Sequence, residues 1–214
     1  MQLQEELEYL NQLIMRMADT VLANLKEALD VYQNYDEGKY YDEINDDIVD
    51  QQERMIEEEC LNIMIKERPY ARDMRRVSGI LKLVEDLERL GDQAEDVMGF
   101  SLKLKNTERH HIEKINEIVD AAMSMVNDCI LCFVKQDVEL ATDVIKRDDI
   151  VDNLYEELIE YLIQEDGINA ISSSFAIYTV LVLKYIERIA DHAVNIAEWV
   201  VYIVNGYYKD KQIF

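Results

Sequence analysis

Residues that interrupt helices are scarce in this chain of 214 residues, which has six glycines and a single proline, Pro69. Few turns can be built from so little glycine and proline, and the abundant Leu, Glu and Lys are good helix formers. These shortages exclude a protein made of many short strands. Because 49% of the residues are hydrophobic, we expect an all-α fold with a sizeable core.

Cysteine is also rare. Cys60, Cys129 and Cys132 are odd in number and give no disulfide framework. Cys129 and Cys132 form a Cys-x-x-Cys pair, but the pair lies inside an apolar helical run and no second pair accompanies it. We therefore expect thiols that pack in the core rather than redox or zinc chemistry.

Long apolar runs are missing as well. The longest apolar stretches, 175–183 and 199–204, fall far short of the about 20 residues that span a bilayer. The first residues include neither a basic segment nor an apolar core, so no signal peptide is visible. These features predict a cytoplasmic protein that meets membrane complexes only peripherally.

Basic residues are outnumbered, with 22 Lys and Arg against 45 Asp and Glu and a net charge of −23. Such a charge argues against a nucleic-acid partner, because nucleic acid is itself a polyanion. It favours cations or basic partner surfaces. Much of it needs no ligand, since excess charge of one sign also keeps soluble proteins apart.

The apolar pattern predicts six long helices. Hydrophobic residues recur at every third or fourth position from Leu3 to Tyr32, which is typical of one helical stripe. The same pattern predicts further helices over 40–66, from Pro69 to about 104, from after Thr107 to 135, over 138–163 and over 172–205. Long helices joined by short turns form bundles. We expect two tandem, pseudo-symmetric three-helix bundles with domains at 1–105 and 106–214.

Acidic pairs recur in the two halves. On a helix, residues four apart share one face, so a Glu-x-x-x-Asp segment presents two carboxylates on the same side. Each half combines such a segment on its third helix with an Asp-x-x-x-Asp pair on its middle helix. The candidate metal ligands are Asp46, Asp50, Glu88 and Asp92 in the first half, and Asp148, Asp152, Glu187 and Asp191 in the second.

Hard oxygen ligands in this number suit Mg²⁺, Ca²⁺, Mn²⁺ or iron rather than an ion bound by thiolates. An alternative is that these acids pair with Arg89 and Arg188 and otherwise face water. His192 could add a nitrogen ligand or a supporting contact in the second half, where the first half has Gln93.

A basic island interrupts the acidic chain near Pro69. Arg72, Arg75 and Arg76 follow Arg68 closely, and the second half has serines at the equivalent point. Arginines grouped in this way can grip an anion or an acidic partner. The interpretation we favour from sequence is that they pair with the chain's own acids.

Residues 87–94 and 186–198 resemble the paired signature of the PhoU family, and 68–73 and the Asp-x-x-x-Asp pairs match its pattern too. The resemblance spans essentially the whole chain. Three positions depart from the family pattern: Gln93 stands where the family usually has His, Asp96 where it has Asn, and Ala190 where it has Gly. The second acidic set is therefore nearer the pattern than the first.

The resemblance implies a cytoplasmic regulator of phosphate uptake, built from two three-helix bundles and without catalysis of its own. It implies negative regulation, with the protein acting as an adaptor between the ATPase subunit of a phosphate ABC transporter and a sensor histidine kinase. It also implies multinuclear iron or zinc clusters on the eight carboxylates named above, and a homodimer.

Two other interpretations stay open at this point. A di-iron carboxylate enzyme would normally use two Glu-x-x-His motifs, and only Glu108-x-x-His111 fits that spacing. A metal-free helical scaffold would keep the architecture and have no site.

Overall fold

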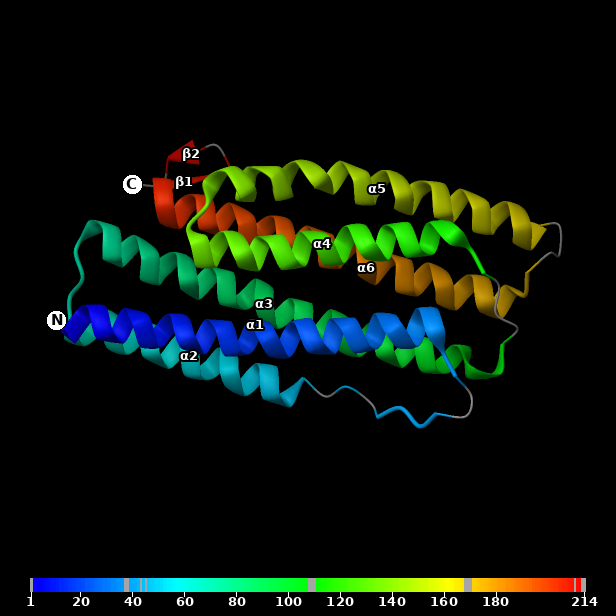
Figure 1. Ribbon diagram of the computed structural model, residues 1–214, viewed down its shortest axis with the longest axis horizontal. Coiled ribbons are helices and arrows are strands. Elements are labelled where there is room, and N and C mark those ends of the chain that lie inside the picture. Colours follow the sequence, from blue (N-terminus) through cyan, green and yellow to red (C-terminus); the bar gives the residue numbers. More distant parts are fainter. Residues whose placement is uncertain are drawn as a thin grey trace.

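The computed structural model describes residues 2–36, 39–42, 44, 46–107, 111–167, 171–209 and 211–212. Six long helices dominate this part of the chain (Figure 1). They are α1 (Gln2–Asn34), α2 (Asp47–Lys66), α3 (Ala71–Lys103), α4 (Glu113–Lys135), α5 (Val138–Gly167) and α6 (Ser173–Asn205). The predicted all-α class is confirmed.

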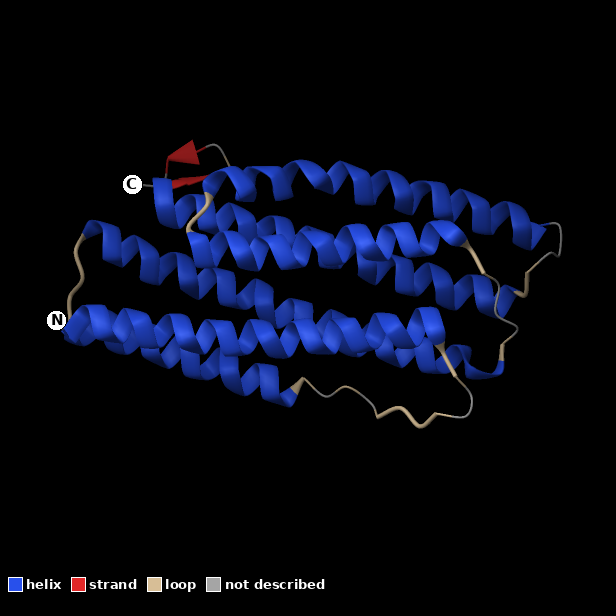
Figure 2. Cartoon of the chain, in the orientation of Figure 1, coloured by secondary structure: helices blue, strands red, loops and turns tan. Residues whose placement is uncertain are grey.

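Three short elements were not indicated by the sequence. A 3₁₀ turn, η1 (Leu104–Asn106), continues α3, and strands β1 (Tyr207–Tyr208) and β2 (Lys211–Gln212) pair antiparallel after α6 (Figure 2). Such a short pair leaves the helical architecture unchanged.

The helices form two layers of three that run along a common long axis (Figure 1). α1, α2 and α3 pack together, α4, α5 and α6 pack together, and the most extensive contact between any two helices joins α3 to α6. Two tandem three-helix bundles are therefore confirmed, and one apolar core runs through both. The predicted division at 105 and 106 stays a prediction, since residues 108–110 lie outside the described part.

Several helix ends differ from the sequence prediction. α2 begins at Asp47 instead of Tyr40, because the preceding segment folds back on the end of α1. The ring of Tyr41 packs on Tyr35 with centroids 5.3 Å apart, and its hydroxyl accepts a hydrogen bond from the backbone N–H of Asp36. Through these contacts Tyr41 packs against the end of α1 and is not part of α2.

Two of the predicted helix-end residues, Ser172 and Gly206, act as expected, and a third, Thr107, does not. Ser172 caps α6 by accepting a hydrogen bond from the N–H of Phe175 at 3.2 Å. Gly206 ends the same helix with φ +83°, a conformation that glycine adopts without strain. Thr107 closes η1 instead of capping the fourth helix, which begins at Glu113.

The three cysteines are buried, as expected of packing thiols. Burial raises the pKa of Cys60 and of Cys132 to about 12 and also raises the pKa of Cys129. The thiols of Cys129 and Cys132 donate to the carbonyls of Val126 and Cys129 within α4. No described helix contains a stretch apolar enough to cross a membrane.

Candidate metal centres

The first acidic set lies where α2 and α3 approach each other closely. Val49 is fully buried against Gly91, and a Cβ on Gly91 would lie only 3.0 Å from Cγ1 of Val49. Asp50 follows Val49 on α2, and Asp92 follows Gly91 on α3. The small residue at position 91 therefore brings the two carboxylate-bearing helix faces together.

Electrostatic repulsion shows that the four predicted residues of the first half form one group. Burial, followed by the charge of Asp92, raises the pKa of Glu88 to about 7. Burial also raises the pKa of Asp46, which directly precedes α2, together with the charges of Asp50 on α2 and Asp92 on α3. The side chain of Glu88 is 16% exposed, so water relieves little of this repulsion.

One arginine partly neutralises the group. Arg89 donates to Asp92 at 2.7 Å and lies 3.4 Å from Glu88, which agrees with the alternative that it pairs with these acids. Arg89 does not neutralise the group fully, because the pKa of Glu88 stays raised although Arg89 lowers it.

Two further acids belong to the first group and were missed from sequence. Burial is the main cause that raises the pKa of both Glu53 and Glu95. The next cause is the charge of Glu57 at Glu53 and the charge of Asp46 at Glu95. Glu53 lies three residues after Asp50 on α2, so the i, i+3 spacing on the same face would have revealed it.

The second group joins the middle of α5 to the middle of α6. Burial, then the charges of Asp152 and Asp191, raises the pKa of Asp148 to about 6. Burial also raises the pKa of Asp191, together with Glu187 and Asp152. The structure thus brings all eight predicted residues into two cross-helix groups.

The cations near the second group differ from the prediction. Lys184 pairs with Glu187 at 2.5 Å. Arg188 lies over the ring of Tyr185, 6.0 Å from its centroid, and forms no ion pair with any carboxylate in the described ranges. Pairing of Arg188 with the acids of its own half is therefore wrong.

The two groups are not equivalent. Where the first half carries Glu53 and Glu95, the matching positions of the second half are Tyr155 and Val194. Lys184 lies over the Tyr155 ring, 5.5 Å from its centroid. The first group is therefore the more acidic of the two.

The donor chemistry fits a hard cation. Carboxylates crowded at raised pKa values lack counter-charge, and a cation supplies it. The amide oxygen of Gln93, a residue only 5% exposed, has no hydrogen-bond partner. Gln93 lines a hollow of about 490 Å³ together with Arg89, Asp92, Glu95, Asp96, Arg188 and His192.

The ligand atoms are not yet gathered around a point. Among the described residues, no three His, Cys, Asp or Glu side chains are arranged as a ready metal site. Binding would require Arg89 and Lys184 to release the carboxylates that they hold.

His192 has a different partner from the one that the sequence suggested. Its Nδ1 lies 2.9 Å from Oδ1 of Asp86 on α3, a residue that sequence reasoning missed. Asp86 also accepts hydrogen bonds from Asn195 at 3.1 Å and from the indole of Trp199 at 3.2 Å. One carboxylate therefore fastens α3 to α6, and its signal in the sequence was the polar stripe 192, 195 and 199 on one face of α6.

The arginines of the basic island lie near one acid, Asp73, but none of their contacts within the described ranges is an ion pair. Arg75 donates to the carbonyls of Ile203 at 3.3 Å and Val204 at 3.4 Å, at the end of α6. Within the described ranges, none of the four arginines at 68, 72, 75 and 76 forms an ion pair with a carboxylate. The favoured sequence interpretation of this island is therefore wrong.

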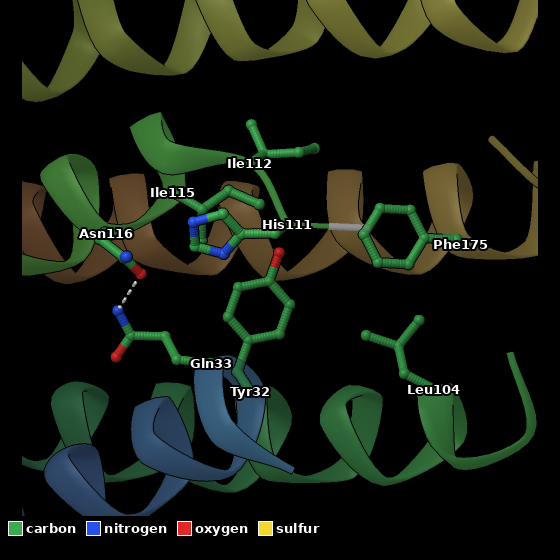
Figure 3. Close-up of a pocket in the computed structure, with 8 residues that line it drawn as sticks. All are labelled: Tyr32, Gln33, Leu104, His111, Ile112, Ile115, Asn116 and Phe175. Atoms are coloured by element: carbon green, nitrogen blue, oxygen red, sulfur yellow. Dashed lines mark hydrogen bonds between the residues drawn. The ribbon is translucent and has the colours of Figure 1, made fainter. Parts of the chain in front are cut away.

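A second hollow, a cavity of about 200 Å³, lies between the two layers (Figure 3). Gln33 of α1 donates across it to Asn116 of α4 at 2.8 Å. His111 lines it together with both polar and apolar side chains, and none of the eight predicted ligands does. Glu108, its partner in the Glu-x-x-His motif, lies outside the described residues.

The fold and the two carboxylate groups define a tandem helical-bundle protein with a candidate cation centre in each half. The PhoU domain family model matches residues 14–99 and 115–200. The chain belongs to the PhoU family.

Named relatives span nearly the whole chain. A phosphate-specific transport system accessory protein PhoU homolog of Pseudomonas aeruginosa is 34% identical over 214 residues, which cover 96% of this chain and 86% of that protein. A homolog of the same name from Clostridium acetobutylicum is 30% identical over 207 residues, covering 95% and 94%.

Solved structures agree with the fold. The crystal structure of PhoU from Pseudomonas aeruginosa superposes with a TM-score of 0.85 at 32% identity, covering 95% of this chain and 99% of that one. A phosphate transport system regulatory protein PhoU from Streptococcus pneumoniae superposes with a TM-score of 0.74 at 23% identity, over 98% and 97% of the chains. The second likeness concerns the fold alone.

Proposed function

We propose that this chain is a cytoplasmic accessory regulator of phosphate transport that binds metal ions and has no catalytic activity of its own. The observation that carries the metal part is the pair of cross-helix acidic groups, in which burial and mutual repulsion raise the pKa of Glu88 to about 7 and of Asp148 to about 6. Perturbed carboxylates of this kind concentrate at functional sites.

The proposed ligands are those of the sequence prediction. Asp46, Asp50, Glu88 and Asp92 would hold the first centre, and Asp148, Asp152, Glu187 and Asp191 the second. A bound cation would supply positive charge that ties α2 to α3, or α5 to α6. Iron or zinc is our expectation, and Mg²⁺, Ca²⁺ or Mn²⁺ suit the same oxygen donors.

The regulatory part rests on membership of a family whose members are named accessory proteins of phosphate-specific transport. We expect a homodimer that contacts the ATPase subunit of the phosphate ABC transporter and a sensor histidine kinase, with negative regulation as the outcome. No observation favours the di-iron enzyme or the metal-free scaffold over this function.

Elemental analysis tests the metal centres. Protein purified without chelator is compared with the double variant Asp92→Ala and Asp191→Ala, which removes one ligand from each group. Asp19→Ala with Asp120→Ala is the matched control, because these aspartates are exposed on α1 and α4. The ligand variant should lose metal and the control should keep it; equal metal content in all three proteins would refute the ligand assignment.

A reporter tests the regulatory part separately. Deleting the gene should raise the expression of a phosphate-responsive promoter in phosphate-replete cells, since a negative regulator is lost. An unchanged reporter would contradict regulation even if the metal centres are real.

A further inference from the structure

A polar cavity of about 200 Å³ lies where the start of α3 meets the end of α6. It is lined by Gln4, Arg72, Asp73, Arg76, Gln136 and the 203–204 end of α6. These residues come from both halves of the chain, and their helix ends meet at the left-hand end of Figure 1. A water molecule takes about 30 Å³ of liquid volume, so the cavity has room for a small tetrahedral ion with water around it.

The arginines of the cavity lack the partners that such side chains normally have. Nε of Arg76 is buried and has no hydrogen-bond partner. Neither Arg72 nor Arg76 forms an ion pair within the described ranges, although acids outnumber bases by 45 to 22 in the whole sequence. A buried donor without an acceptor is costly, and an oxyanion would satisfy it.

The two guanidinium groups also repel each other. Burial lowers the pKa of Arg76; the charge of Asp73 opposes this shift, and the charge of Arg72 reinforces it by a smaller amount. An anion between the two arginines would remove this repulsion, because it is attracted to both.

Arg75 reduces the negative charge that the end of α6 presents to the cavity. The end of α6 carries the negative end of the helix dipole, which would repel an anion. Arg75 donates to the carbonyls of Ile203 and Val204 at that end and so offsets their charge. Arg72 and Arg76 remain available for a ligand.

Asp73 gives the cavity a preference among anions. Its carboxylate lines the same space and can only accept hydrogen bonds when ionised. Phosphate carries at least one proton at neutral pH and can donate it to such an acceptor, whereas sulfate carries none. A site with two arginine donors and one carboxylate acceptor therefore suits a protonated oxyanion.

We propose that this cavity binds inorganic phosphate in its protonated forms. The site is separate from the carboxylate groups and does not depend on a metal. The overall charge of −23 opposes anions from a distance, but salt screens that field beyond about 8 Å at physiological ionic strength. At the cavity itself, Arg72 and Arg76 place two positive charges against the single carboxylate of Asp73.

Calorimetric titration of the full chain tests the proposal. The protein is first treated with chelator, so that phosphate cannot bind through a metal, and is then titrated with phosphate and, in parallel, with sulfate. We expect saturable binding of phosphate and at least about tenfold weaker binding of sulfate, since one hydrogen bond to a charged group is lost with sulfate. Equal binding of the two anions, or no binding of phosphate, would overturn the proposal.

Two variants locate the site. Arg76→Gln should weaken phosphate binding by roughly 10- to 100-fold, the loss of a charge-assisted hydrogen bond. Arg16→Gln is the matched control, because Arg16 is an exposed arginine of α1 that leaves the cavity unchanged. Unchanged affinity in Arg76→Gln would contradict the assignment.

Asp73→Asn separates recognition from folding. The amide keeps the size of the side chain and adds donors, so the preference for phosphate over sulfate should shrink or reverse. A purely structural role for Asp73 would leave that ratio constant, which would refute its part in recognition. Circular dichroism verifies that each variant is folded. If Arg76→Gln does not fold, the ratio of phosphate to sulfate affinity in Asp73→Asn decides whether the proposal stands.

Discussion

Removing the acid with the most raised pKa in the first group should stabilise the protein in the absence of metal. Glu88→Gln keeps the size of the side chain and removes its charge. In the metal-free protein, burial and Asp92 hold the pKa of Glu88 at about 7 against a usual value of 4.5. Glu88 therefore binds its proton more tightly in the folded state than in the unfolded state, and ionising it works against folding.

The sign and size of the effect follow from this difference. Because the folded state binds more protons, stability is highest below about pH 4.5 and falls as the pH rises through about 7. Each pKa unit corresponds to about 1.36 kcal/mol, so the shift of Glu88 can destabilise the folded state by at most roughly 3 kcal/mol. Arg89 is 58% exposed and water screens part of the repulsion, so we expect a gain of about 1 to 3 kcal/mol for Glu88→Gln at pH 8.

Urea unfolding in chelator at a series of pH values measures the gain. Glu88→Gln and the unmodified protein should have similar free energies of unfolding near pH 4.5 and should diverge as the pH rises to 8. Glu85→Gln is the control, because Glu85 lies on the same helix with a side chain 52% exposed and paired to Lys82. That variant should change stability by less than about 1 kcal/mol.

A metal-loaded sample completes the test. Ions that bind only the folded state stabilise it, and Glu88→Gln should lose much of that stabilisation because a ligand is gone. A variant that is less stable than the unmodified protein at pH 8 in chelator would show that Glu88 is an ordinary structural carboxylate, and the reasoning would fail.

Four further predictions concern packing and burial. Gly79→Ala should lower the free energy of unfolding by about 1 kcal/mol or more, because its Cβ would lie 2.4 Å from a side-chain atom of α6 and overpacking costs more than the helix propensity gained. Gly99→Ala, which has nothing within 4 Å of its Cβ, should raise it by about 0.5 to 1 kcal/mol in the same urea assay. Asp86→Ala should cost about 2 to 3 kcal/mol and shift the fluorescence of Trp199, the single tryptophan, since three donors lose their acceptor. A thiol reagent at pH 8 should label none of the three buried cysteines in the native protein and all three in concentrated urea; rapid native labelling would contradict their burial.

Helix number and the pairing of the acids could be predicted because both depend on local periodicity. The 3.6-residue repeat places Glu88 and Asp92 on one face whatever surrounds them. The internal duplication then gives the same arrangement at Glu187 and Asp191. The start of α2 was predicted too early because Tyr41 could follow a helical stripe equally well, and only its contact with Tyr35 shows that it does not.

Contacts between helices could not be predicted in the same way. Which acid of α3 meets which donor of α6 depends on how each helix is rotated about its axis, and periodicity leaves this open. Asp86 was overlooked for that reason, and the contact between Asp86 and His192 was not predicted. The basic island was misjudged because a surplus of acids in the sequence does not say that any of them forms an ion pair with Arg76, and its neighbour Asp73 does not.

Two kinds of partly buried carboxylate in this fold show how a structural acid differs from a candidate ligand. Asp86 is 14% exposed and lies within hydrogen-bond distance of three side chains of α6, so its charge is satisfied by the protein itself. Glu88 is 16% exposed, and burial together with the negative charge of Asp92 raises its pKa. The fold supplies three donors to the carboxylate of Asp86 and leaves repelling acids around Glu88, so an external cation would lower the electrostatic energy of the second carboxylate and not of the first. That contrast, more than the number of acids, is why the α2–α3 and α5–α6 contacts are better places to look for cations than Asp86 is.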